Sequence, residues 1–124
     1  MKKLSILIIL LLVVGCANKE ITYQNITDDA AIIELENDSS IVLLDVRTKP
    51  ENEEKRIPNS TLIPIDMLEY IVQDEIENKD TKIFVYCGTG IRSKRASEIL
   101  VDLGYKNVFN LGGINEWKYD VEWV

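Results

Sequence analysis

The segment that most constrains the fold is KIFVYCGTGIRSKRASEIL, residues 82–100. An apolar run from Lys82 ends at Cys87, and a short loop with two glycines separates it from a pattern with helical spacing. Short uninterrupted apolar runs are typical of strands that are covered on both faces, as in parallel sheets. The segment therefore predicts a buried strand that turns directly into a helix, with Cys87 at the carboxyl end of the strand.

Strand and helix patterns alternate along the rest of the chain. A second continuous apolar run covers residues 40–46, and weaker strand candidates are residues 21–23, 61–63 and 107–110. Three sets of apolar residues have helical spacing: Ala31, Ile32 and Leu35; Leu68, Ile71, Val72 and Ile76; Ala96, Ile99, Leu100 and Leu103. Thr27 can cap the first helix, and Gly104 stands where a left-handed stop is expected. We predict an α/β fold with a mostly parallel sheet and helices on both faces.

The first residues have the pattern of an export signal rather than of a folded domain. Lys2 and Lys3 precede an apolar stretch, residues 4–14, that is short for a bilayer span of ~20 residues. Gly15 followed by Cys16 resembles a bacterial lipobox, in which the cysteine becomes the acylated first residue of the mature chain. The alternative is an ordinary signal anchor or cleaved signal with an incidental cysteine.

These patterns divide the chain into three parts. We expect residues 1–15 to be a lipoprotein signal peptide, residues 16–20 a lipid-anchored tether, and residues 21–124 a single domain. The expected location is extracytoplasmic, on the membrane of a bacterial cell envelope, with attachment through a fatty acid such as palmitate.

Composition excludes several classes of function. The chain has 14 basic and 21 acidic residues, which argues against a nucleic-acid partner and against charge-driven binding to an anionic membrane. It has no histidine, so catalytic triads and histidine metal ligands are excluded. Its two cysteines leave Cys87 as the only free thiol if Cys16 is acylated, which excludes an internal disulfide and a cysteine zinc site.

The loop after Cys87 has the residue types of an anion cradle. It consists of Gly88, Thr89, Gly90, Ile91 and Arg92. Glycines let successive amides crowd toward one point, and the start of the following helix adds positive potential. A thiolate at the centre would be stabilised and nucleophilic, and Arg92 would add donors for an oxyanion. The alternative is a buried cysteine that packs as a small hydrophobe beside an ordinary glycine turn.

Four stretches in order resemble the single-domain rhodanese (sulfurtransferase) family. They are LLDVRTKPE at residues 43–51, RIPNSTLIPI at residues 56–65, YCGTGIRS at residues 86–93 and NLGGINEW at residues 110–117. The chain departs from the family's pattern at Asn52, often aromatic, at Lys55-Arg56, usually Gly-His, and at Asn59, usually glycine. The resemblance implies a three-layer fold with a sheet of about five strands.

The same resemblance implies roles for residues. Cys87 would accept a sulfane sulfur as a persulfide from a small anion such as thiosulfate and pass it to a thiol or thioredoxin-like acceptor. Amides of residues 88–92 would hold the anion, Asp45 and Arg47 would brace the neighbouring loop, and no metal or organic cofactor is implied. Only four residues separate Cys87 from Arg92, which favours sulfur transfer over the wider loops of related phosphatases and arsenate reductases. A non-enzymatic sulfur carrier or docking module of the envelope is the other alternative.

Several nearby side chains invite a second interpretation. Arg47 and Glu51 are predicted to form a structural ion pair, whereas the acidic cluster of residues 51, 53 and 54 is expected at the surface. Lys94 and Arg95 would give either a positive rim to the site or a solvated helix face. Residues 117 and 123, the two tryptophans, are expected to be packing anchors.

Overall fold

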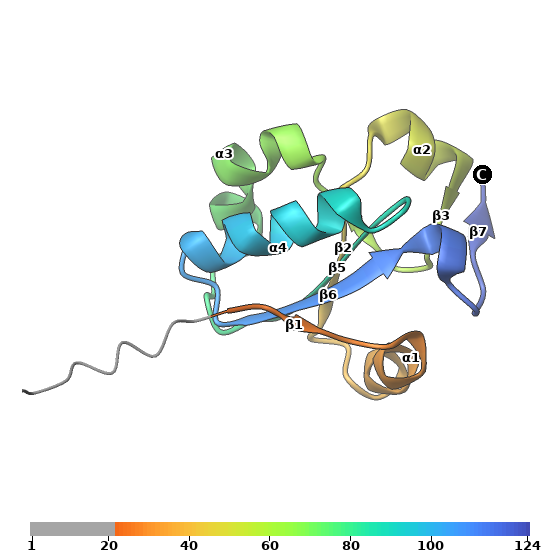
Figure 1. Ribbon diagram of the computed structural model, residues 1–124, viewed down its shortest axis with the longest axis horizontal. Coiled ribbons are helices and arrows are strands. Elements are labelled where there is room, and N and C mark those ends of the chain that lie inside the picture. The colour runs from red at the N-terminus through yellow and green to blue at the C-terminus, as the bar shows by residue number, and fades with distance from the viewer. Residues whose placement is uncertain (1–21) are drawn as a thin grey trace, which may run out of the picture.

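The centre of the molecule is a sheet of five parallel strands, shown by a computed structural model that describes residues 22–124 (Figure 1). The strand order is β1-β6-β5-β2-β4. The bounds are β1 Gln24–Asn25, β2 Val42–Asp45, β4 Thr61–Leu62, β5 Lys82–Cys87 and β6 Asn107–Gly113. Parallel neighbours place the carboxyl ends of β2 and β5 at one edge, because Asp45 is in register with Tyr86.

Helices cover both faces of this sheet (Figure 1). The helix α1 (Asp28–Asn37) lies on one face, and α3 (Ile65–Glu75) and α4 (Ile91–Asp102) lie on the other. Side chains of β5 alternate accordingly: Val85 and Cys87 pack in the cluster beneath α3 and α4, whereas Tyr86 packs in the cluster beneath α1. The thiol of Cys87 therefore faces the same side of the sheet as α4.

The predicted fold class is confirmed, and the errors concern short elements. Thr27 caps α1 by accepting a hydrogen bond from the amide of Ala30, and Gly104 is left-handed with φ 97°. The strand expected at residues 21–23 begins later: residues 22 and 23 are not in a strand, β1 comprises Gln24–Asn25, and residue 21 lies outside the described residues. A small antiparallel pair, β3 (Lys55–Arg56) and β7 (Glu122–Trp123), was not predicted, since two-residue strands have no readable periodicity.

The expected signal and tether segments lie outside the described residues. None of the helices in residues 22–124 has the length and apolar character that crossing a bilayer requires.

A buried carboxylate ties the carboxyl end of β2 to the segment that follows it. Asp45 is fully buried and accepts hydrogen bonds from the backbone and guanidinium of Arg47, from Asn52 Nδ2 at 3.0 Å and from the Tyr86 hydroxyl at 3.1 Å. Arg47 also donates to the carbonyl of Lys55 at 2.6 Å. These bonds fix α2 (Lys49–Glu54) against the edge where β2 and β5 end.

Replacing this carboxylate tests how much the network stabilises the domain. Asp45→Asn should lower the free energy of unfolding by about 3 kcal/mol, because the buried Arg47 guanidinium loses its counter-charge. Urea denaturation followed by circular dichroism measures the change. The matched control is Glu53→Gln, which removes the exposed Lys49–Glu53 pair and should change stability by less than about 0.5 kcal/mol. Equal effects of the two substitutions would contradict the assignment.

Candidate active site

The candidate site is built around the sulfur of Cys87 at the carboxyl end of β5. The amide N–H of Gly90 points back into the loop and donates to Cys87 Sγ at 3.0 Å. Cys87 itself is 0% exposed, so the thiol is enclosed by the loop rather than displayed at the surface. The structure has a feature of each interpretation of the sequence: Cys87 is buried, as expected for a packing residue, and its sulfur lies inside the loop that was predicted to be an anion cradle.

Glycine is required at the point where the loop enters α4. Gly90 is the N-cap of α4 and has φ 101°, a left-handed conformation that side chains other than glycine rarely adopt. The cap makes no side-chain hydrogen bond to the helix, so its first amides are not tied to a capping residue. Ser93 Oγ instead donates to the carbonyl oxygen of Gly90 at 3.0 Å, and this hydrogen bond stabilises the turn.

The close approach of Gly113 to the backbone of Gly88 and Thr89 explains how the loop is held in place. Gly113, at the end of β6, is in register with Cys87. A Cβ atom on Gly113 would overlap the carbonyl oxygen of Gly88 and approach two backbone atoms of Thr89 at 2.9 Å. The amide of Asn115 donates to that same Gly88 carbonyl at 3.2 Å. The backbone of β6 and its continuation therefore form the wall against which the loop packs.

Arg92 is paired with Glu51, and the predicted ion pair between Arg47 and Glu51 is wrong. The two Nη atoms of Arg92 donate to the two carboxylate oxygens of Glu51 at 2.7 and 2.9 Å. This bidentate pair lies beside Gly88, and the guanidinium lowers the pKa of Glu51 to about 2. Arg47 instead pairs with Asp45 and touches Glu51 only through its carbonyl oxygen, at 3.4 Å.

Glu51 is therefore part of the site rather than of a surface cluster. It also completes a capping box on α2, where its side chain accepts from the backbone N–H of Thr48. The pattern Thr48-x-x-Glu51 signals this capping role in the sequence, but nothing in the sequence signals the contact with Arg92 across 41 positions. Glu53 and Glu54 are exposed, as expected.

The predicted supporting residues lie one layer behind the loop. Asp45 and Arg47 are buried under α2, and they reach the loop through Glu51 rather than by contacting Cys87 directly. Asn52, at a departure from the family pattern, fills a buried position and donates to Asp45. Asn59, another departure, has φ 63°, a left-handed conformation that asparagine tolerates better than most residues.

A cavity of about 320 Å³ opens beside the loop. Its walls include Gly88, Thr89, Arg92, Lys55, Ile114 and Trp123. Trp123 is 70% exposed, so the expectation that it is a packing anchor is wrong, whereas Trp117 packs against the core beneath α1. Lys94 and Arg95 are both exposed, and Arg95 shares a second cavity of about 400 Å³ with Arg92.

Other features of the described residues lie away from this chemistry. A further hollow of about 800 Å³ is lined by residues of α1 and by the segment around Trp117, on the opposite face of the sheet from Cys87. Within residues 22–124 no group of three or more acidic, cysteine or histidine side chains is arranged to hold a metal ion.

Comparisons with known proteins agree with this geometry. A family model described as "Rhodanese-like domain" matches residues 28–120. The chain is 35% identical over 86 residues to "Thiosulfate sulfurtransferase GlpE" of Coxiella burnetii, covering 68% of this chain and 78% of that protein. It is 36% identical over 84 residues to a "Sulfurtransferase" of Allochromatium vinosum, covering 67% and 77%. Among solved structures, a rhodanese-related protein from Thermoplasma volcanium superposes with a TM-score of 0.68 at 33% identity, covering 81% of this chain and 98% of that one.

The close approach of Gly113 to the loop yields a direct test. Gly113→Ala should displace Gly88 and Thr89, because the new methyl group would overlap backbone atoms of these two residues, which cannot rotate away as a side chain can. The amide resonances of residues 88–92 in a nitrogen–proton NMR spectrum measure the displacement. Gly104→Ala is the control, since a Cβ atom on Gly104 meets nothing within 4 Å. Its φ of 97°, against −104° at Gly113, adds backbone strain to the control but no clash with the loop. Unshifted loop resonances in Gly113→Ala would contradict the proposed wall.

Proposed function

Because the chain belongs to the rhodanese-like domain family, we propose that it is a sulfurtransferase in which Cys87 accepts a sulfane sulfur and passes it on. The observation that carries the proposal is the hydrogen bond from the Gly90 amide to Cys87 Sγ inside a short glycine loop. The relatives named sulfurtransferase and thiosulfate sulfurtransferase support the same reaction class and support thiosulfate as a donor.

The proposed reaction has two balanced steps. The thiolate of Cys87 attacks the outer sulfur of thiosulfate, a bond forms between these two sulfur atoms, and sulfite leaves with the electron pair of the broken sulfur–sulfur bond. The resulting persulfide anion is then attacked at its terminal sulfur by a thiolate or by cyanide. Cys87 is regenerated as a thiolate, and the sulfur leaves on the acceptor as a persulfide or as thiocyanate.

The residues of the loop account for how such an anion is held without histidine. The Gly90 amide already donates to the sulfur, and the uncapped start of α4 contributes further positive potential. Arg92 supplies a permanent charge at the edge of the loop, although its guanidinium is engaged by Glu51. The oxyanion of an incoming donor can compete with Glu51 for that guanidinium, which makes the Glu51–Arg92 pair the part of the site that responds to the donor.

The burial of Cys87 adds one requirement. Because the residue is 0% exposed, a donor reaches the sulfur only after the mouth of the loop widens. The wall formed by Gly113 is backbone and stays fixed, whereas the Glu51–Arg92 pair joins two side chains that are each 36% exposed. We therefore place the opening at the ion pair.

Removing the nucleophile tests the reaction. The purified chain should convert thiosulfate and cyanide to thiocyanate, and Cys87→Ser should reduce kcat/KM by ~10³-fold or more. Mass spectrometry should show an adduct of about 32 Da on the wild type that Cys87→Ser lacks. An adduct that forms once without turnover would favour the stoichiometric carrier instead. Equal turnover by the two proteins would rule out Cys87 as the sulfur acceptor.

We also propose that Cys16 is acylated and anchors the domain to a bacterial envelope membrane. The support is the sequence alone: a basic start, a short apolar stretch and Gly15 before the cysteine.

Cys16→Ser tests the anchor. The variant should lose incorporation of labelled palmitate in bacterial cells and should move from the detergent phase to the aqueous phase in a partition assay. Cys87→Ser serves as the control because it removes the other cysteine and should leave labelling unchanged. Persistent labelling of Cys16→Ser would contradict acylation at this residue.

A further inference from the structure

The cavity beside the loop offers more space than an inorganic donor needs. Its volume of about 320 Å³ corresponds to roughly ten water molecules at ~30 Å³ each, whereas thiosulfate has only five non-hydrogen atoms. This volume lies at the lower end of the range for pockets that bind organic ligands, which is ~300–1,000 Å³. The cavity is lined by loop residues Gly88 and Thr89, so a molecule that reacts at Cys87 can extend into it.

The outer wall of this cavity is an exposed tryptophan that a short strand puts in place. Trp123 belongs to β7, which pairs with β3 so that Trp123 is opposite Lys55. The amide of Val124 donates to the carbonyl of Glu54 at 3.2 Å, which holds the strand against the end of α2. Trp123 lies beyond residue 120, where the match to the family model ends, so the family resemblance does not account for this wall.

Lys55 supplies a positive charge on the same wall. Its ammonium group lies 5.1 Å from the centroid of the Trp123 ring, and within residues 22–124 no carboxylate forms an ion pair with it. The other two cations of the cavity are engaged, Arg47 by Asp45 and Arg92 by Glu51. Glu54 also lines the cavity but lies outside ion-pair distance of Lys55. An indole beside an ammonium that has no carboxylate partner in the described part of the chain suits a ligand that has both a flat carbon skeleton and a carboxylate.

We infer that Trp123 and Lys55 form a subsite that binds the organic part of a sulfane-sulfur donor carrying an aromatic or extended carbon group and a carboxylate. This subsite rests on the proposed sulfur transfer at Cys87 and deepens it by naming the class of donor. The transfer step is balanced for such a donor: an aryl thiosulfonate gives its outer sulfur to the Cys87 thiolate, and the sulfonyl sulfur leaves as an aryl sulfinate with the bonding electron pair.

Three donors separate the contributions of the two residues. Thiosulfate, benzenethiosulfonate and 4-carboxybenzenethiosulfonate are each assayed with cyanide as the acceptor. In the wild type, kcat/KM should rise along this series. Trp123→Ala should reduce kcat/KM for both aryl donors about five- to tenfold and for thiosulfate by less than about twofold. Trp123→Phe should retain most of the preference for aryl donors over thiosulfate. Lys55→Met should remove only the advantage of the carboxylated aryl donor over the uncarboxylated one.

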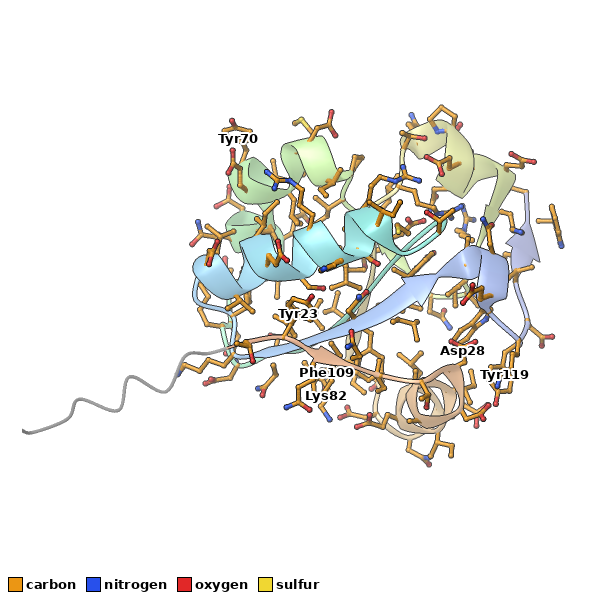
Figure 2. The ribbon with its side chains drawn as sticks, viewed as in Figure 1. Tyr23, Asp28, Tyr70, Lys82, Phe109 and Tyr119 are labelled. Atoms are coloured by element: carbon orange, nitrogen blue, oxygen red, sulfur yellow. The ribbon has the colours of Figure 1, made fainter. Side chains whose placement is uncertain are left out.

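The control is an aromatic residue that is equally exposed but lies on another element. Tyr70 is 71% exposed and projects from α3, at the opposite end of the molecule from β7 (Figure 2). Tyr70→Ala should leave the donor preference unchanged. If Tyr70→Ala rather than Trp123→Ala removed the preference, the organic group would bind in the cavity beside Arg95 and the inference would be overturned. An equal loss for all three donors in Trp123→Ala would also overturn it.

A binding measurement separates this inference from the proposed function. The product 4-carboxybenzenesulfinate is titrated calorimetrically into Cys87→Ser, which cannot turn over. Binding that Trp123→Ala in the same background weakens about five- to tenfold supports the subsite even if the wild type shows no sulfur transfer. Turnover of thiosulfate by the wild type with no measurable sulfinate binding, and with no preference among donors, would leave sulfur transfer intact and refute the subsite.

Discussion

The buried carboxylate of Asp45 is the constraint on which the rest of the site depends. A charge with no access to water must be matched by donors, and here they come from Arg47, Asn52 and Tyr86. Satisfying it brings α2 against the ends of β2 and β5. That placement puts Glu51 within reach of Arg92, so a structural requirement in the core decides which partner the guanidinium of the loop has.

In the proposed anion cradle the contacts come from backbone groups, in a chain without histidine. The donor that contacts the sulfur is an amide, and the surface against which the loop packs is the glycine backbone of β6. Backbone groups need no side-chain ordering to reach their positions, which makes them preorganised donors for a sulfur anion. The glycines at 90 and 113 serve different purposes, one for a left-handed turn and one for close approach.

Local patterns in the sequence predicted what depends on local physics. The apolar runs of β2 and β5, the cap at Thr27 and the left-handed Gly104 are decided by a few neighbouring residues, and all are found. The ion pairs could not be predicted in the same way: Arg47 was expected to pair with Glu51, whereas Glu51 pairs with Arg92 across 41 positions. The tertiary fold gave Arg47 the nearer and fully buried Asp45. Trp123 was misjudged because its exposure depends on the pairing of β7 with β3, in which Trp123 is opposite Lys55, 68 positions earlier in the chain.

In the proposed reaction, the enclosure of Cys87 links recognition of the donor to the rate of sulfur transfer. Opening the mouth means separating a bidentate ion pair, and that free energy has to come from contacts with the donor. Thiosulfate can offer only its own charge to Arg92. A donor with a carbon skeleton on Trp123 gains binding energy at a point away from the reacting sulfur, which can be used to open the ion pair. The subsite should therefore act on kcat as well as on KM, since uniform binding alone would lower KM without changing kcat.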